Sequence, residues 1–146
     1  MHSKKKIESF EDLRVWQNGI ELVKQIYLIT NDGKLSKDFG LRDQLRPASV
    51  SIPTNIAEGF ERASYKEYLY FLNISKGSAG ELRSLLRVAL EVEYIERSIY
   101  SQLYNRAIEL SRILSKQISQ SSELLRLKFV FLNPFIPYPL PLLPYL

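Results

Sequence analysis

Hydrophobic residues recur every three or four positions in four long segments, which is the spacing of one face of an α-helix. These segments span residues 10–30, 39–61, 64–94 and 96–125. The linkers between them are short, and helices joined by short linkers pack as antiparallel neighbours. The pattern therefore predicts an all-α fold, an antiparallel up-down-up-down four-helix bundle over residues 10–126.

Local signals agree with these helix bounds. Two helix starts have a serine three residues before an acidic residue, the spacing of a capping box. The two pairs are Ser9 with Asp12 and Ser64 with Glu67. Residues 31–34 are expected to form a loop, after which Ser36 or Asp38 can cap the second helix. That helix contains Pro47 and Pro53, which each remove a backbone donor, so we expect it to be continuous but bent.

The apolar positions of the first and fourth segments define predicted core faces. In the first segment the predicted buried positions are Leu13, Trp16, Ile20, Val23 and Tyr27. In the fourth segment they are Ile99, Leu103, Ala107, Leu110 and Leu114. The fourth segment also has a second apolar flank, formed by Tyr100, Tyr104, Ile108 and Ile118. One bundle does not need two apolar flanks on a single helix, so this flank predicts contact with another subunit.

Two short stretches place glycine and small residues inside the second and third helices. Within a helix, glycine is about 1 kcal/mol less favourable than alanine, and close approach of a second helix is the usual compensation. The stretches therefore predict a packing seam. Its predicted residues are Asn55, Glu58, Gly59, Gly77, Gly80 and Glu81. The two glutamates are expected to pair with an arginine or to accept hydrogen bonds from Asn55 or Ser78.

Composition excludes several kinds of catalytic site. The chain has no cysteine, and its single histidine is His2. Thiolate zinc sites, cysteine nucleophiles and the Glu-x-x-His pairs of a di-iron bundle are therefore excluded. We expect no metal, no cofactor and no enzymatic activity. The one enzyme hypothesis that survives uses Glu58 and Glu81 as a carboxylate pair.

Basic residues are concentrated near the N-terminus and in the fourth helix. The formal net charge is +4, and residues 97–128 carry six basic residues against two acidic ones. A basic helix can bind RNA or DNA, and the alternative is a solvated helix face. The candidate nucleic-acid-binding residues are Lys4, Lys5, Lys6, Arg97, Arg106, Arg112 and Lys116.

The two ends of the chain differ from the bundle. Residues 1–9 are predicted to be a flexible basic N-terminus and residues 127–146 an apolar, proline-rich tail. From Phe129 onward there is no charged residue and there are five prolines. These prolines exclude the regular helix of a membrane span, so no membrane contact is expected. The tail should have an extended backbone. It should either lie along a groove of its own subunit or of a neighbouring subunit, or be a non-native extension.

Five ordered motifs carry a resemblance to a known family. They are Phe10-Glu11-Asp12-Leu13-Arg14-Val15-Trp16-Gln17, Leu41-Arg42-Asp43-Gln44-Leu45-Arg46, Ser51-Ile52-Pro53-Thr54-Asn55-Ile56-Ala57-Glu58-Gly59, Tyr68-Leu69-Tyr70-Phe71-Leu72 and Gly77-Ser78-Ala79-Gly80-Glu81-Leu82. Over about residues 10–118 the chain closely resembles the four-helix-bundle proteins encoded within intervening sequences of bacterial 23S rRNA genes. It is also similar to the accessory proteins of diversity-generating retroelements, which share the bundle and bind nucleic acid and a reverse transcriptase.

The resemblance implies a bacterial cytoplasmic protein that forms a ring-like homo-oligomer, a pentamer. The leading functional hypothesis is a non-enzymatic, oligomeric nucleic-acid-associated protein that binds RNA through its basic residues. The alternative is a protein-interaction scaffold or accessory subunit that docks a protein partner and does not contact nucleic acid.

Overall fold

The computed structural model of the protein describes residues 7–132, with side chains placed for residues 7–125. Its elements in chain order are a 3₁₀ turn η1 (Phe10–Asp12) and the helices α1 (Arg14–Asn31), α2 (Gly33–Lys37), α3 (Phe39–Glu61), α4 (Tyr65–Glu91) and α5 (Arg97–Leu132). No strand occurs within this part of the chain. The all-α fold class is therefore confirmed.

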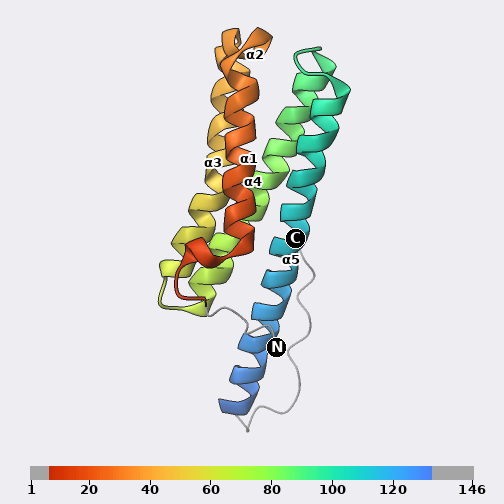
Figure 1. Ribbon diagram of the computed structural model, residues 1–146. Coiled ribbons are helices and arrows are strands. Elements are labelled where there is room, and N and C mark those ends of the chain that lie inside the picture. Colours follow the sequence, from red (N-terminus) through yellow and green to blue (C-terminus); the bar gives the residue numbers. More distant parts are fainter. Residues whose placement is uncertain (1–6, 133–146) are drawn as a thin grey trace, which may run out of the picture.

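Four long helices form the bundle. The helices α1, α3, α4 and α5 run side by side, and each runs opposite to the one before it along the chain (Figure 1). Helix α3 packs between α1 and α4, while α4 packs between α3 and α5. Helix α1 also contacts α5, which closes the ring of four. The predicted four-helix bundle is confirmed.

Helix bounds differ from prediction in three places. The first helix was expected from Phe10, but residues 10–12 form the 3₁₀ turn η1 and α1 begins only at Arg14. The expected loop at 31–34 contains the start of the short helix α2, and α5 continues to Leu132 instead of ending near residue 125. At the start of α3 the cap is Asp38, whose Oδ1 accepts the N–H of Leu41 at 2.9 Å. Helix α4 starts with the predicted serine cap, Ser64 Oγ accepting the N–H of Glu67 at 3.2 Å.

The core face of α5 was predicted well. That of α1 was predicted only in part, correctly at Leu13, which is buried, and at Trp16, which packs against the core. On α5 the buried residues include Leu103, Ala107, Leu110 and Leu114, with Ile99 exposed. On α1 the buried stripe is Val15, Gly19, Leu22, Ile26 and Thr30. The predicted residues Ile20 and Tyr27 are 42% and 39% exposed. Apolar residues cover two adjacent faces of α1, and their spacing alone does not show which face meets α3.

A small residue and a local hydrogen bond explain the stripe that α1 buries. A Cβ on Gly19 would stand 3.3 Å from the Cβ of Pro53, so glycine allows α1 and α3 to approach closely. Pro53 is buried inside α3, which runs without interruption through both prolines. The Thr30 hydroxyl donates to the carbonyl oxygen of Ile26 at 2.7 Å, so this buried polar group has a hydrogen-bond partner. The predicted continuity of the second helix is confirmed.

The predicted seam between α3 and α4 is correct at Gly59. A Cβ there would stand 3.0 Å from the Cβ of Phe71 and 3.3 Å from the carbonyl oxygen of Tyr68. Hydroxyls complete the seam, with Ser51 Oγ and Ser78 Oγ 2.8 Å apart. The Asn55 amide donates to Ser51 Oγ at 2.9 Å. Close backbone approach and a small polar network therefore hold α3 against α4.

The seam prediction is wrong at Gly77 and Gly80. No atom lies within 4 Å of a Cβ built on Gly77, and on Gly80 the nearest is Nη2 of Arg83 from the same helix, at 3.9 Å. Successive residues of a helix are about 100° apart, so Ser78 and Ala79 turn toward α3 while the two glycines face outward. Both are buried.

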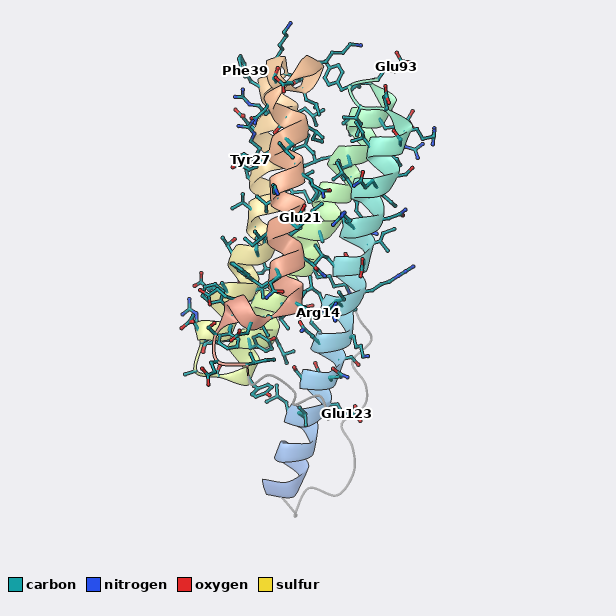
Figure 2. The ribbon with its side chains drawn as sticks, viewed as in Figure 1. Arg14, Glu21, Tyr27, Phe39, Glu93 and Glu123 are labelled. Carbon is teal, nitrogen blue, oxygen red and sulfur yellow. The ribbon has the colours of Figure 1, made fainter. Side chains whose placement is uncertain are left out.

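Glu93 has a left-handed backbone conformation in the turn after α4 (Figure 2). Its φ is 59°, and the Tyr94 N–H donates to the Ala89 carbonyl at 2.9 Å, as in a Schellman helix end. Glycine adopts this conformation without steric penalty. We expect Glu93→Gly to raise the free energy of unfolding by roughly 0.5–1 kcal/mol in urea titrations. Glu96→Gly is the control, and an equal gain there would contradict a backbone origin.

Candidate functional site

Two adjoining open hollows lie between α4 and α5. One is lined by Gly80, Arg83, Ser84, Arg87, Val88, Tyr100 and Tyr104, and the other by Arg83, Ile108, Ser111, Arg112 and Ser115. Arg83 lines both, so we call the combined surface the α4–α5 groove. Three arginines and two tyrosines line it, and neither lining includes an aspartate or a glutamate. Tyr100 is only 9% exposed and belongs to the core, so the groove is a cationic surface with the half-buried Tyr104 as its more accessible ring.

Arg83 lies at the centre of this groove. Its guanidinium carbon is 5.9 Å from the centroid of the Tyr104 ring, within cation–π range. Its Nε is buried and makes no hydrogen bond within the described chain, and the same holds for Ser111 Oγ. Buried polar atoms normally have a hydrogen-bond partner. Both atoms are exceptions to this rule, and because they are buried, a ligand in the groove does not reach them unless side chains move.

Arg87 lies one turn further along α4. It pairs with Glu91 at 2.5 Å, and both side chains are exposed. A side-chain hydrogen bond with Tyr100, followed by the charge of Glu91, raises the pKa of Arg87 above its ordinary value. Arg87 is therefore charged and held beside Tyr100, although an anionic ligand must compete with one carboxylate.

Helical spacing aligns further groups with these arginines. Lys76 lies two turns before Arg83 on the same side of α4, and it is exposed. Gly77 and Gly80 lie beside this line and add no side chain. Gly80, which was predicted to meet another helix, lines the groove instead.

The predicted nucleic-acid-binding residues do not form one surface. Lys4, Lys5 and Lys6 lie outside the described residues. Arg112 lines the groove, and Lys116 lies one turn further along α5 and is exposed. Arg106 is nine residues after Arg97, so the two project from opposite sides of α5, about 180° apart.

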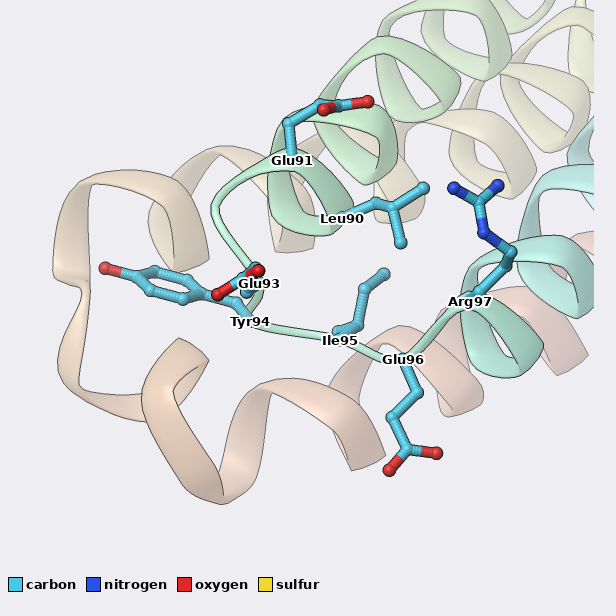
Figure 3. Close-up of a pocket in the computed structure, with 7 residues that line it drawn as sticks. All are labelled: Leu90, Glu91, Glu93, Tyr94, Ile95, Glu96 and Arg97. Carbon is cyan, nitrogen blue, oxygen red and sulfur yellow. The ribbon is translucent and has the colours of Figure 1, made fainter.

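Arg97 also has an acidic environment. It lines an open pocket at the turn between α4 and α5, together with Glu91, Glu93 and Glu96 (Figure 3). Carboxylates repel a phosphate group. Among the predicted residues within the described chain, Arg112 therefore has the surroundings best suited to bind an anion.

Residues 11–116 match the model of a protein family described as 23S rRNA-intervening sequence protein. This match covers most of the chain. The chain belongs to the 23S rRNA-intervening sequence protein family. The resemblance carried by the five sequence motifs is thereby confirmed.

A solved structure of a relative has the same helical fold. It is a protein of unknown function from the S23 ribosomal protein family of Bacteroides thetaiotaomicron, with 26% sequence identity and a TM-score of 0.66. The similarity covers 71% of this chain and 97% of that one. Among curated proteins no match was found. These comparisons establish the family of the chain, and neither the family description nor the solved structure names a ligand.

Glu58 and Glu81 do not form the carboxylate pair of the enzyme hypothesis. Both are exposed, and Glu58 forms an ion pair with Arg62, one turn further along α3. The expectation of an arginine partner is therefore confirmed for Glu58. Glu58 is near the end of α3, whereas Glu81 is sixteen residues into α4, so the two lie roughly 20 Å apart along the bundle. This separation is too large for two groups to act on one bond.

The described residues contain no group of three or more histidine, cysteine, aspartate or glutamate side chains that could hold a metal ion. None of their helices is long and apolar enough to cross a membrane.

Sequence reasoning missed Arg83 and Arg87 as candidate site residues. The net charge of residues 63–96 conceals these two arginines, because Glu91, Glu93 and Glu96 lie at the end of that stretch. The signal was present in their spacing. Arg83 and Arg87 are separated by one helical turn, so they share one side of α4.

Proposed function

We propose that this protein is a non-enzymatic, oligomeric nucleic-acid-associated protein that binds RNA along the α4–α5 groove. The observation that carries the proposal is the acid-free lining of three arginines and two tyrosines. The family description names an rRNA intervening sequence, which favours RNA as the class of nucleic acid. We place its action in the bacterial cytoplasm.

The groove has the chemistry that single-stranded RNA requires. Arginine forks bind phosphate oxygens through two hydrogen bonds, and tyrosine rings stack on bases without sequence preference. Arg83 and Arg112 line the same hollow, and Tyr104 lies on the other side of Arg83. Phosphate and base contacts can therefore be made side by side.

Oligomerisation would strengthen this binding. The α1 residues Ile20, Tyr27 and Leu28 are exposed, and the Arg46 guanidinium lies over the Tyr27 ring. These exposed side chains offer apolar area for contact with a second copy of the chain. Figure 2 shows Tyr27 at the outer edge of α1. A ring, such as the pentamer expected from the family, presents several grooves on one body and raises apparent affinity without new contacts.

Salt dependence tests the proposal. Three phosphate contacts on a single strand correspond to a slope of about −2 in log K against log salt, so affinity for an oligouridine should fall roughly 20-fold from 50 to 200 mM salt. Fluorescence anisotropy with a labelled oligouridine measures this. No binding at the lower salt, or binding that salt does not weaken, would refute the proposal.

The alternative function is a protein-interaction scaffold, favoured by the same exposed apolar residues of α1 if a different protein covers them. A pull-down with and without nuclease separates the two functions. A scaffold keeps its protein partner after nuclease treatment, whereas an RNA-bridged partner is released.

A further inference from the structure

An aromatic pocket lies at the end of the bundle where α3 turns into α4. It is an open cavity of about 350 Å³. Its lining is Ile7, Leu13, Gly59, Phe60, Arg62, Ala63, Ser64, Tyr65 and Tyr68. The rings of Tyr65 and Tyr68 meet edge to face, with centroids 6.4 Å apart. The pocket is thus mainly apolar with two phenol groups, and it is separate from the α4–α5 groove.

We propose that this pocket, hereafter the aromatic pocket, binds the chain's own proline-rich C-terminal segment, residues 133–146. That segment has five prolines and no charged residue. Proline-rich segments in a polyproline II conformation bind grooves lined by aromatic side chains, because the preformed backbone loses little entropy. The proposal is independent of RNA binding.

The position at which α5 ends brings the segment to this pocket. Helix α5 has 36 residues and its antiparallel neighbour α4 has 27, so α5 extends about 14 Å beyond the start of α4. Figure 1 shows this extension at the end of the bundle that carries the α3–α4 turn. The chain therefore leaves the described residues near the aromatic pocket.

The remaining segment is long enough to turn back. Asn133-Pro134 follows α5 directly, and this dipeptide favours a turn. The fourteen residues of 133–146 span roughly 43 Å in a polyproline II conformation. This length covers the return to Tyr65 and leaves several residues to occupy the pocket.

The chemistry of the pocket suits this occupant. A polyproline II backbone has no internal hydrogen bonds, so its carbonyl groups are available as acceptors. Burial, with a smaller contribution from Tyr65, raises the pKa of Tyr68, so its hydroxyl keeps a proton to donate. Proline and leucine side chains of the segment can pack against the tyrosine rings and Phe60.

The pocket at the opposite end of the bundle suits this occupant less well. Its lining includes Glu91, Glu93 and Glu96, so an uncharged apolar segment would desolvate carboxylates there. It also lies about 54 Å from the end of α5, the length of that helix.

Spin-label distances in the full chain test the proposal. The chain has no cysteine, so introduced cysteines are labelled uniquely. One pair is Lys66→Cys, an exposed position beside the pocket and outside its lining, with Leu140→Cys, and the control pair is Ser98→Cys with Leu140→Cys. With the labelled chain diluted in unlabelled protein, we expect a narrow distance distribution for the first pair, shorter than the control distance by more than about 20 Å.

Pocket variants complete the test. In the first label pair, Tyr65→Ala and Tyr68→Ala should each broaden the distribution, whereas the exposed α1 variant Tyr27→Ala should leave it narrow. Circular dichroism melting checks that each variant folds, and Tyr65→Ala decides if Tyr68→Ala does not. A broad distribution in the parent chain, or a short distance that appears only between labels on different copies, would overturn the proposal.

Discussion

Replacing Gly59 with valine is expected to lower the free energy of unfolding by about 3 kcal/mol, because it overpacks the contact between α3 and α4. A Cβ at this position stands 3.0 Å from the Cβ of Phe71 and 3.3 Å from the backbone oxygen of Tyr68. The backbone of α4 cannot move away without disturbing the hydrogen bond between Ser51 and Ser78. Urea unfolding at a fixed protein concentration measures the change.

Gly77→Ala is the matched control for this substitution. Gly77 is also a helical glycine, but no atom lies within 4 Å of its added Cβ. The variant should gain up to about 1 kcal/mol from helix propensity alone. If Gly59→Val is tolerated, the close contact of α3 with α4 is wrong. If Gly77→Ala is destabilising, Gly77 packs against a second copy of the chain.

The double variant Arg83→Gln with Arg112→Gln is expected to reduce affinity for single-stranded RNA about 30-fold at moderate salt. Two lost phosphate contacts at roughly 1 kcal/mol each correspond to this factor. Both arginines line the same hollow of the α4–α5 groove. The slope of log K against log salt should also become shallower by about 1.4. Glutamine keeps part of each side-chain stem, which limits the loss of packing.

Arg106→Gln removes the same charge elsewhere on α5. Arg106 lines neither hollow of the groove and lies about 120° around the helix from Arg112. Affinity should change less than twofold. An equal loss in Arg106→Gln and in Arg112→Gln would show that net charge, and not the groove, determines binding.

The sequence predicted the architecture because helix spacing and caps are local properties. Ser64 caps α4 as expected, and α3 spans the predicted residues 39–61. The buried face of α1 was predicted only in part, since Ile20 and Tyr27 follow helical spacing as well as Leu22 and Ile26 do. Only the contact of Gly19 with Pro53 decides between the two faces, and that contact joins residues distant in the chain.

The candidate site was less predictable for a related reason. Arg112 was identified from the basic charge of the last helix, but Arg83 and Arg87 lie within residues 63–96, where five acidic residues outnumber four basic ones. Their association with Tyr100, Tyr104 and Arg112 depends on how α4 packs on α5. The distribution of charge along the sequence does not show which residues of α4 face which residues of α5.

Mapping of ultraviolet crosslinks by mass spectrometry locates bound RNA most directly. With an oligouridine bound to the purified full chain, the groove predicts adducts on the tryptic peptide 98–106, which contains Tyr100 and Tyr104. Both tyrosines line the groove between α4 and α5. Adducts at Trp16 or Tyr27 of α1, with none on that peptide, would contradict the assignment of the α4–α5 groove as the RNA-binding surface.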